Sequence, residues 1–290
     1  MNKTIAKTVE QYLSEVNYKE WEENYIPSEF ALKYMNFIKM VNAGKDDIQT
    51  SPLFHYRMVE SLGSKSTRIA NLCLRGAGKT VVMGEMLVLY LAVFNELPHL
   101  GKCNVIIYVA DSMENGAKSL RTNVEARYNH SEFLQHYIPE AKFTDSELVF
   151  KNIEGKETYV KLFGASSGVR GFKRNGDRPV LAILDDLISD DMANSKVQLE
   201  KVYDLIYKAV DNALNPKRNK IIFSGTPFNK ADPLYRAIES GAWEANVYPM
   251  CTQFPCTEEE FNPAWAERFS YEEMIKKYQD AIKLGRVKAF

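Results

Sequence analysis

The sequence predicts an α/β fold in which a mostly parallel central sheet is flanked by helices, with an N-terminal helical segment and a C-terminal helical subdomain. Its 290 residues are 45% hydrophobic and 26% charged, values that allow a full hydrophobic core. From about residue 66, short apolar runs rich in β-branched residues alternate with helical stretches, as in parallel sheets whose strands are joined by helices. Residues 1–64 instead have the apolar spacing of amphipathic helices.

Composition and charge narrow the class of protein. The formal net charge is −1, so any surface for nucleic acid must be local, and disordered, collagen-like and low-complexity proteins are excluded. The N-terminus has no apolar signal segment, and the longest apolar run, 81–94, is shorter than the ~20 residues of a membrane span. Four scattered cysteines suit a reducing compartment, so we expect a cytoplasmic protein. Cys251 and Cys256 leave a zinc site open, although plain thiols are favoured.

Five apolar runs are the expected strands. They cover residues 69–74, 105–110, 158–163, 180–184 and 221–223. A helix over 80–94 should follow the first strand, and Asp111-x-x-Glu114 resembles a capping box that opens a helix after the second. Apolar residues at helical spacing over 202–213 predict a helix ahead of the fifth strand.

The chain beyond about 245 is expected to lack strands. Prolines mark an irregular stretch over 249–263, and Ser270-x-x-Glu273 then caps a final helix that runs towards Gly285. The sequence ends soon after this helix without a stop signal, so we expect it to be a piece of a longer protein.

The strongest chemical signal is the run Leu-Arg-Gly-Ala-Gly-Lys-Thr at 74–80, between an expected strand and an expected helix. In a phosphate-binding loop, glycines let backbone N–H groups close around the phosphates, and the helix N-terminus adds its positive dipole. Lys79 would bridge the β- and γ-phosphate oxygens, and Thr80 would place its hydroxyl on Mg²⁺. The expected ATP contacts are Arg75, Gly76, Ala77, Gly78, Lys79 and Thr80. Cys73 stands where the usual pattern has glycine, and a turn with a surface lysine is the alternative.

Two acids follow the expected strand 180–184. The carboxyl end of a strand is where α/β sheets place ligands, so Asp185 fits the Walker B acid that supports Mg²⁺. Asp186 sits where a carboxylate would orient the attacking water, although most such ATPases have Glu there. A helix cap after a strand is the alternative for this pair. Asp190 and Asp191 have no strand before them and are expected to be solvated loop charges.

The order of the motifs resembles a known family. The phosphate loop with its internal arginine is followed by Val169-Arg170-Gly171, then by the two acids, then by Ser224-Gly225-Thr226-Pro227 after a strand. This series is similar to the N-terminal ATPase domain of the large terminase subunit of tailed bacteriophages, over about 50–245. A small-polar turn beside a Walker B strand can touch the γ-phosphate and move on hydrolysis.

The resemblance implies an ASCE-type P-loop NTPase that uses ATP and Mg²⁺ to drive double-stranded DNA into a procapsid. The implied partners are DNA, the portal protein, the small terminase subunit and further copies of the chain in a ring, in the host cytoplasm and transiently at the portal. The implied organisation is a lid segment over 1–64, an ATPase core over 65–245 and a linker subdomain over 246–290. The family's nuclease domain would follow outside this chain, so we expect no DNA cleavage from it.

The resemblance also implies roles for single residues. Lys79 and Thr80 match the phosphate and metal ligands, Asp185 matches the metal-supporting acid, and Asp186 matches the catalytic carboxylate. Arg75 matches a nucleotide-sensing arginine, and Thr226 lies in the coupling turn. Phe54 and His55 match the region near the adenine, with a packed histidine as the alternative. Arg170 matches an arginine that acts on a neighbour's ATP, with a DNA-facing or ion-paired residue as the alternative.

Two basic groups in the sequence are candidate DNA contacts. Residues 151–178 hold seven Lys or Arg against three acids, and Lys217, Arg218 and Lys220 form a second basic group. Either group could contact DNA phosphates without reading the base sequence.

The alternative functions are a superfamily 2 helicase-like ATPase, a small-molecule kinase, and a nucleotide-gated DNA-binding or assembly module without turnover. The helicase would need a second α/β domain, for which the residues after 245 are too few.

Overall fold

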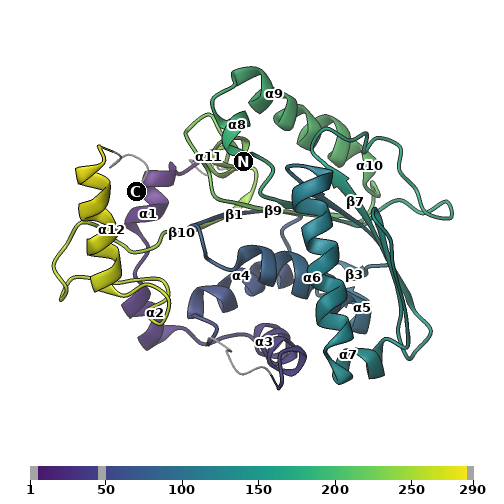
Figure 1. Ribbon diagram of the computed structural model, residues 1–290. Helices are drawn as coiled ribbons and strands as arrows, with labels where there is room; N and C mark the ends of the chain where they lie inside the picture. The colour runs from purple at the N-terminus through teal and green to yellow at the C-terminus, as the bar shows by residue number, and fades with distance from the viewer. Residues whose placement is uncertain (1–5, 45–49, 286–290) are drawn as a thin grey trace.

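The structure is a computed structural model that describes residues 6–44 and 50–285. An eight-stranded sheet in the order β10-β1-β9-β8-β4-β7-β6-β5 forms its centre, with helices on both faces (Figure 1). The strands are β1 (Arg68–Cys73), β4 (Val105–Ala110), β5 (Glu140–Phe143), β6 (Glu147–Lys151), β7 (Glu157–Gly164), β8 (Leu181–Asp185), β9 (Lys220–Gly225) and β10 (Glu244–Tyr248), and β2 (Glu96–Leu97) pairs with β3 (Gly101–Lys102) in a separate hairpin.

Five of the seven strand pairs in this sheet are parallel. They join β10 through β7, and the two antiparallel pairs, β7–β6 and β6–β5, lie at one edge. All five predicted strands are present, within one or two residues of their expected ends. The expected α/β fold with a mostly parallel sheet is therefore confirmed.

Helices cover the two faces in two layers. One layer holds α3 (Glu29–Val41), α4 (Leu53–Gly63), α5 (Met86–Phe94), α6 (Lys118–Asn129) and α7 (Glu132–Tyr137). The other holds α1 (Val9–Ser14), α8 (Asp190–Ala193), α9 (Lys196–Asp204), α10 (Asp211–Ala213) and α11 (Pro233–Glu239). Three π-helical segments adjoin these helices: Val81–Glu85, Met113–Ala117 and Leu205–Val210. Both faces of the sheet are thus buried, which explains why its strands are apolar along their length.

Residues 6–44 and 50–64 pack into the same core as the sheet. Tyr34 of α3 is fully buried, stacks on Tyr90 of α5 with ring centroids 4.9 Å apart, and donates a 2.6 Å hydrogen bond to the Val82 carbonyl. That carbonyl belongs to the first turn after the phosphate loop, where the expected helix over 80–94 begins as a π-helix. A side chain that takes a helix carbonyl is a common cause of such irregular turns. No break in packing therefore marks the expected boundary at 64 within the described residues.

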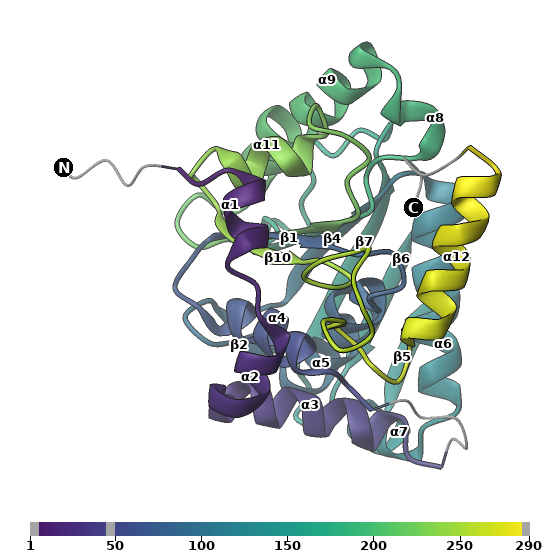
Figure 2. The same cartoon turned by 90° about the vertical axis from the view of Figure 1, so that its left-hand side faces the viewer.

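The C-terminal part ends in α12 (Tyr271–Lys283). Figure 2 shows this helix on the right, in front of α6, whereas α1 and α2 (Tyr18–Asn24) lie on the left of the view with β10. The Ser270 hydroxyl caps α12 as predicted, by accepting a hydrogen bond from the Glu273 amide. The expectation that strands stop at about 245 is wrong, because β10 continues to residue 248 and pairs with β1. The predicted boundary at 245 falls inside this strand.

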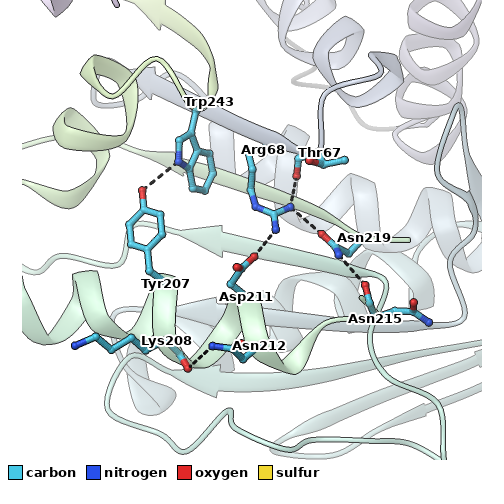
Figure 3. A network of polar contacts seen from close by, with 9 residues as sticks. All are labelled: Thr67, Arg68, Tyr207, Lys208, Asp211, Asn212, Asn215, Asn219 and Trp243. Atoms are coloured by element: carbon cyan, nitrogen blue, oxygen red, sulfur yellow. Dashed lines mark hydrogen bonds and ion pairs between the residues drawn. The ribbon is translucent and has the colours of Figure 1, made fainter. Parts of the chain in front are cut away.

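A polar network holds the end of the sheet that is remote from the phosphate loop (Figure 3). Arg68, at the start of β1, pairs with Asp211 of α10 and donates a 2.8 Å hydrogen bond to Asn219. Beside it, the Trp243 indole donates to the Tyr207 hydroxyl at 3.1 Å. These contacts tie the helical stretch 196–213 to the start of β1 and to the residues that precede β9 and β10.

Candidate nucleotide site

A cavity of about 460 Å³ opens at the carboxyl ends of β1, β4, β8 and β9. Because these strands are parallel, their carboxyl ends share one edge of the sheet. The lining includes Arg75, Gly76, Lys79 and Thr80 from the phosphate loop, Asp185 and Asp186 after β8, Thr226 after β9, and Asp111, Asn115 and Ser119 after β4. The fold thus brings together three of the motifs that sequence analysis singled out.

The Lys79 side chain points into this cavity rather than to open solvent. Its residue is only 8% exposed, and its ammonium lies 2.8 Å from the Asp186 carboxylate. Burial alone would lower the pKa of Lys79, but the Asp186 and Asp185 carboxylates outweigh burial and raise it. Lys79 therefore carries a positive charge and faces two carboxylates. A phosphate group that enters the cavity could bind this ammonium.

Asp185 is buried at the floor of the cavity. Its Oδ2 accepts a 2.8 Å hydrogen bond from the Tyr108 hydroxyl, whereas its buried Oδ1 has no hydrogen-bond partner within the described residues. Burial and the neighbouring Asp186 charge raise the pKa of Asp185 above its usual range. An unpartnered buried carboxylate oxygen beside the Thr80 hydroxyl fits Mg²⁺, which prefers oxygen ligands and few protein groups.

Asp186 joins the phosphate loop to the turn after β9. Its Oδ2 holds Lys79, and its Oδ1 accepts a 3.2 Å hydrogen bond from the Thr226 amide. Its φ is 43°, in the left-handed region that non-glycine residues rarely adopt. Such strain, about 1–3 kcal/mol, is retained where the surroundings enforce it, and it gathers at functional sites.

Arg75 lies at the rim of the cavity. Its guanidinium is 3.3 Å from Asp190 and rests over the Phe228 ring at 5.5 Å from the centroid. Asp190 is a solvated charge as expected, with its side chain 80% exposed, but it lies at the start of α8 rather than in a loop and lines the cavity. Both side chains of this ion pair are largely exposed, so a phosphate could displace Asp190 at little cost.

His55 lies behind the phosphate loop and is not among the residues that line the cavity. Its Nε2 donates a 2.6 Å hydrogen bond to the Ala77 carbonyl, and its ring packs edge-on against Trp265. Gly78 adopts φ +71°, a backbone conformation that other residues rarely take, and a Cβ there would lie 3.4 Å from this ring. The structure therefore gives His55 the packed arrangement, and its role is to support the backbone of Ala77 and Gly78 from below.

The stability of the protein should fall in acid because of His55. Burial lowers the pKa of His55 to about 4 from 6.5, so the unfolded chain binds a proton here that the native chain refuses. Stability is therefore fully present above pH 6.5 and is lost as the pH falls to 4, by about 3 kcal/mol. We expect denaturant titrations of His55→Gln to show a shallower loss over this range than the wild type, whereas the exposed control His136→Gln should keep the wild-type slope. Parallel slopes in all three proteins would contradict this assignment.

Several of the predicted DNA-contact residues have partners within the protein itself. Lys220 is buried at the start of β9 and donates to the Leu62 and Ser64 carbonyls at 2.8 Å, so its predicted contact with DNA is wrong. Arg218 donates to the Leu100 and Lys102 carbonyls. In the stretch 151–178, Lys151, Lys156 and Lys161 pair with Glu140, Glu154 and Glu147.

Arg170 and Lys173 lie in an exposed turn after β7, outside the cavity. Neither side chain has an ion-pair or hydrogen-bond partner among residues 6–44 and 50–285. Their charges are therefore available to an incoming partner, whether a phosphate backbone or the site of another subunit.

Other sequence-based alternatives find no support in the part of the chain that the structure describes. No group of three His, Cys, Asp or Glu side chains there could hold a metal ion, and Cys251 and Cys256 are free thiols. None of the described helices is long and apolar enough to cross a membrane.

Several lining residues escaped sequence analysis. Tyr108, Asp111, Asn115 and Ser119 line the cavity from β4 and the helical segments that follow it. The capping residue there is Ser112 rather than the expected Asp111, whose Oδ1 accepts from the Ser112 amide. A polar residue directly after a buried strand was the one available signal, and it pointed to a cap.

No family model matches the sequence, and no curated protein matches it. The large terminase of bacteriophage HK97 superposes with a TM-score of 0.57 at 18% identity, over 87% of this chain and 52% of that one. The ATPase domain of the Thermus phage P74-26 large terminase superposes with a TM-score of 0.50 at 11% identity, over 88% of this chain and 93% of that one. The chain has the fold of a large-terminase ATPase domain.

In this chain, β9 lies between β1, which leads into the phosphate loop, and β8, which ends at the two acids. The chain spans about half the length of the HK97 large terminase but nearly all of the Thermus phage ATPase domain.

Proposed function

We propose that this chain is the ATPase motor domain of a viral large terminase, which hydrolyses ATP to move double-stranded DNA into a procapsid. The observation that carries the proposal is the Lys79 ammonium, held in a cavity whose opposite wall presents Asp185 and Asp186. A triphosphate needs such a cation on one side and a metal-supporting acid on the other. The terminase fold supplies the link from ATP hydrolysis to DNA packaging.

The proposed reaction is in-line attack of water on the γ-phosphoryl group, with release of ADP and phosphate. Lys79 would leave Asp186 and bind the phosphate oxygens, because their negative charge exceeds that of one carboxylate. Asp186, released from Lys79, would then accept a hydrogen bond from the attacking water. Thr80 and Asp185 would hold Mg²⁺, which when bound neutralises charge on the phosphate oxygens.

The same step offers a route for coupling. Asp186 holds the Thr226 amide as well as Lys79, so its release on ATP binding would loosen the turn after β9. That turn leads through Phe228, which touches Arg75, into α11. Movement of this segment with the state of the phosphate is the proposed transmission to DNA.

Partners and organisation belong to the same proposal. We infer that copies of the chain form a ring at the portal protein in the host cytoplasm, together with the small terminase subunit, and that Arg170 and Lys173 face DNA or a neighbour. Residues 246–290 would act as the linker to a nuclease domain outside this chain, and residues 1–64 as a support for the phosphate loop. No DNA cleavage is assigned to this chain.

Phosphate release from ATP, measured with and without double-stranded DNA, tests the function. We expect slow release that needs Mg²⁺ and rises when DNA is added. Transfer of the phosphoryl group to a small acceptor would favour a kinase, and tight ATP binding without release would favour a nucleotide-gated module. Strand separation of a short duplex would favour the helicase-like alternative.

A further inference from the structure

Tyr108 is a buried residue of the cavity that no sequence motif includes. It lies on β4, between β8 and β7 in the sheet, and is 1% exposed. Its hydroxyl reaches across to the end of β8 and donates a 2.8 Å hydrogen bond to Asp185 Oδ2. The ring itself is packed in the core between the sheet and the helices beneath it.

Because of this hydrogen bond, the two carboxylate oxygens of Asp185 have different surroundings. Oδ2 is engaged by Tyr108, while Oδ1 is buried without a hydrogen-bond partner in the described residues. Lys79 does not compensate, because its ion pair is with Asp186. A buried oxygen without a partner costs free energy unless a ligand satisfies it. Oδ1 is therefore the atom of this carboxylate that is left for a ligand.

A carboxylate held at one oxygen cannot rotate freely about its terminal bond. Outer groups that hold a metal ligand in this way commonly decide its orientation, and their loss weakens metal binding about 10- to 100-fold. The Tyr108 hydroxyl holds Asp185 at Oδ2, the Thr80 hydroxyl also interacts with this carboxylate, and the Tyr108 ring is fixed by core packing. The Tyr108 hydroxyl is thus held in a fixed position, and it fixes the orientation of the Asp185 carboxylate in turn.

We propose that Tyr108 is a positioning residue for the divalent cation that accompanies bound ATP. Its hydroxyl holds the Asp185 carboxylate in the orientation that leaves Oδ1 to support the cation beside Thr80. This inference rests on the proposed ATPase function and adds a group to it that acts through Asp185. A purely structural role would make Tyr108 matter for stability alone, since its hydroxyl also satisfies a buried acceptor.

Mn²⁺ binding to the whole chain with a non-hydrolysable ATP analogue separates these roles. Free Mn²⁺ is followed by its paramagnetic resonance signal, and analogue binding in EDTA is followed by fluorescence. For Tyr108→Phe, which keeps the ring, we expect about tenfold weaker Mn²⁺ binding and unchanged analogue binding in EDTA. Tyr18→Phe is the matched control, because its buried hydroxyl donates instead to the Pro249 carbonyl at 2.6 Å.

A double variant tests the route through Asp185. If Tyr108 acts only by orienting that carboxylate, Tyr108→Phe should have no further effect on Mn²⁺ binding in an Asp185→Asn background. Equal Mn²⁺ affinity of the wild type and Tyr108→Phe would overturn the inference while leaving the proposed function intact. Failure of the wild-type chain to bind the analogue with Mn²⁺ would overturn both. Equal losses in Tyr108→Phe and Tyr18→Phe would assign the effect to stability and also overturn the inference.

Discussion

Lys79→Ala should reduce ATP hydrolysis at least a hundredfold while leaving the fold intact. The ammonium is the one lysine charge that the described cavity presents to a triphosphate, and loss of a single such stabilising group typically costs 10²–10³ in rate. Folding should survive because Asp186, the partner left behind, is about half exposed and can be hydrated. Buried Asp185 can take up a proton once the lysine charge that keeps its pKa down is gone.

The measurement is phosphate release under saturating ATP and Mg²⁺, together with a thermal unfolding curve for each variant. Lys208→Ala is the control, since Lys208 is an exposed lysine paired with Asp204 on the opposite layer of helices. It should match the wild type in both measurements. Hydrolysis by Lys79→Ala within tenfold of the wild type would show that the phosphate loop is not the site of turnover.

The central strands of the fold could be predicted because burial on both faces leaves a plain mark in the sequence. The run 105–110 is apolar throughout and became β4 with the same bounds. Strand β5 is half exposed and short, and β6 alternates between buried and intermediate residues, so neither carries that mark. Strand β10 was missed for the same reason: three of its five residues are only partly buried, at the edge of the sheet.

The candidate site was predictable where one segment supplies the chemistry. The phosphate loop was predicted from Gly78, Lys79 and Thr80 together with the expected strand before them and the expected helix after them, and the two acids after a buried strand are equally local. Tyr108 was not recognisable, because an apolar strand residue gains its role only when β8 is placed beside β4. Cross-strand contacts of this kind depend on strand order, which the sequence does not state.

Charge was the least reliable guide to function. Lys220 reads as part of a basic group, yet it caps the Leu62 carbonyl in the interior and contributes nothing to the surface field. Asp190 is the solvated acid that the sequence predicts, but its pairing with Arg75 at the rim of the cavity was not predicted. Whether a charged side chain points into the interior or towards a partner depends on the fold, which residue counts along the chain do not contain.

Arg170→Ala should lower DNA-stimulated hydrolysis by about 10³ or more if this arginine completes the site of a neighbouring subunit. Its turn is exposed and lies outside its own cavity, and within the described ranges it has no ion-pair partner, so its guanidinium is available in trans. An arginine supplied to the γ-phosphate typically contributes a factor of 10³–10⁵. Lys173→Ala is the matched control, because Lys173 is an equally exposed cation of the same turn.

Mixing decides whether Arg170 acts between subunits. An Arg170→Ala chain keeps its own Asp186, and an Asp186→Ala chain keeps its Arg170, so a site between the two retains both groups. Mixtures should therefore hydrolyse ATP faster than either variant alone, since neither variant can form a complete site with itself. If instead Lys173→Ala loses as much activity as Arg170→Ala, and both losses vanish at low salt, the turn binds DNA phosphates through general charge. Absence of recovery at every mixing ratio would contradict an action of Arg170 between subunits.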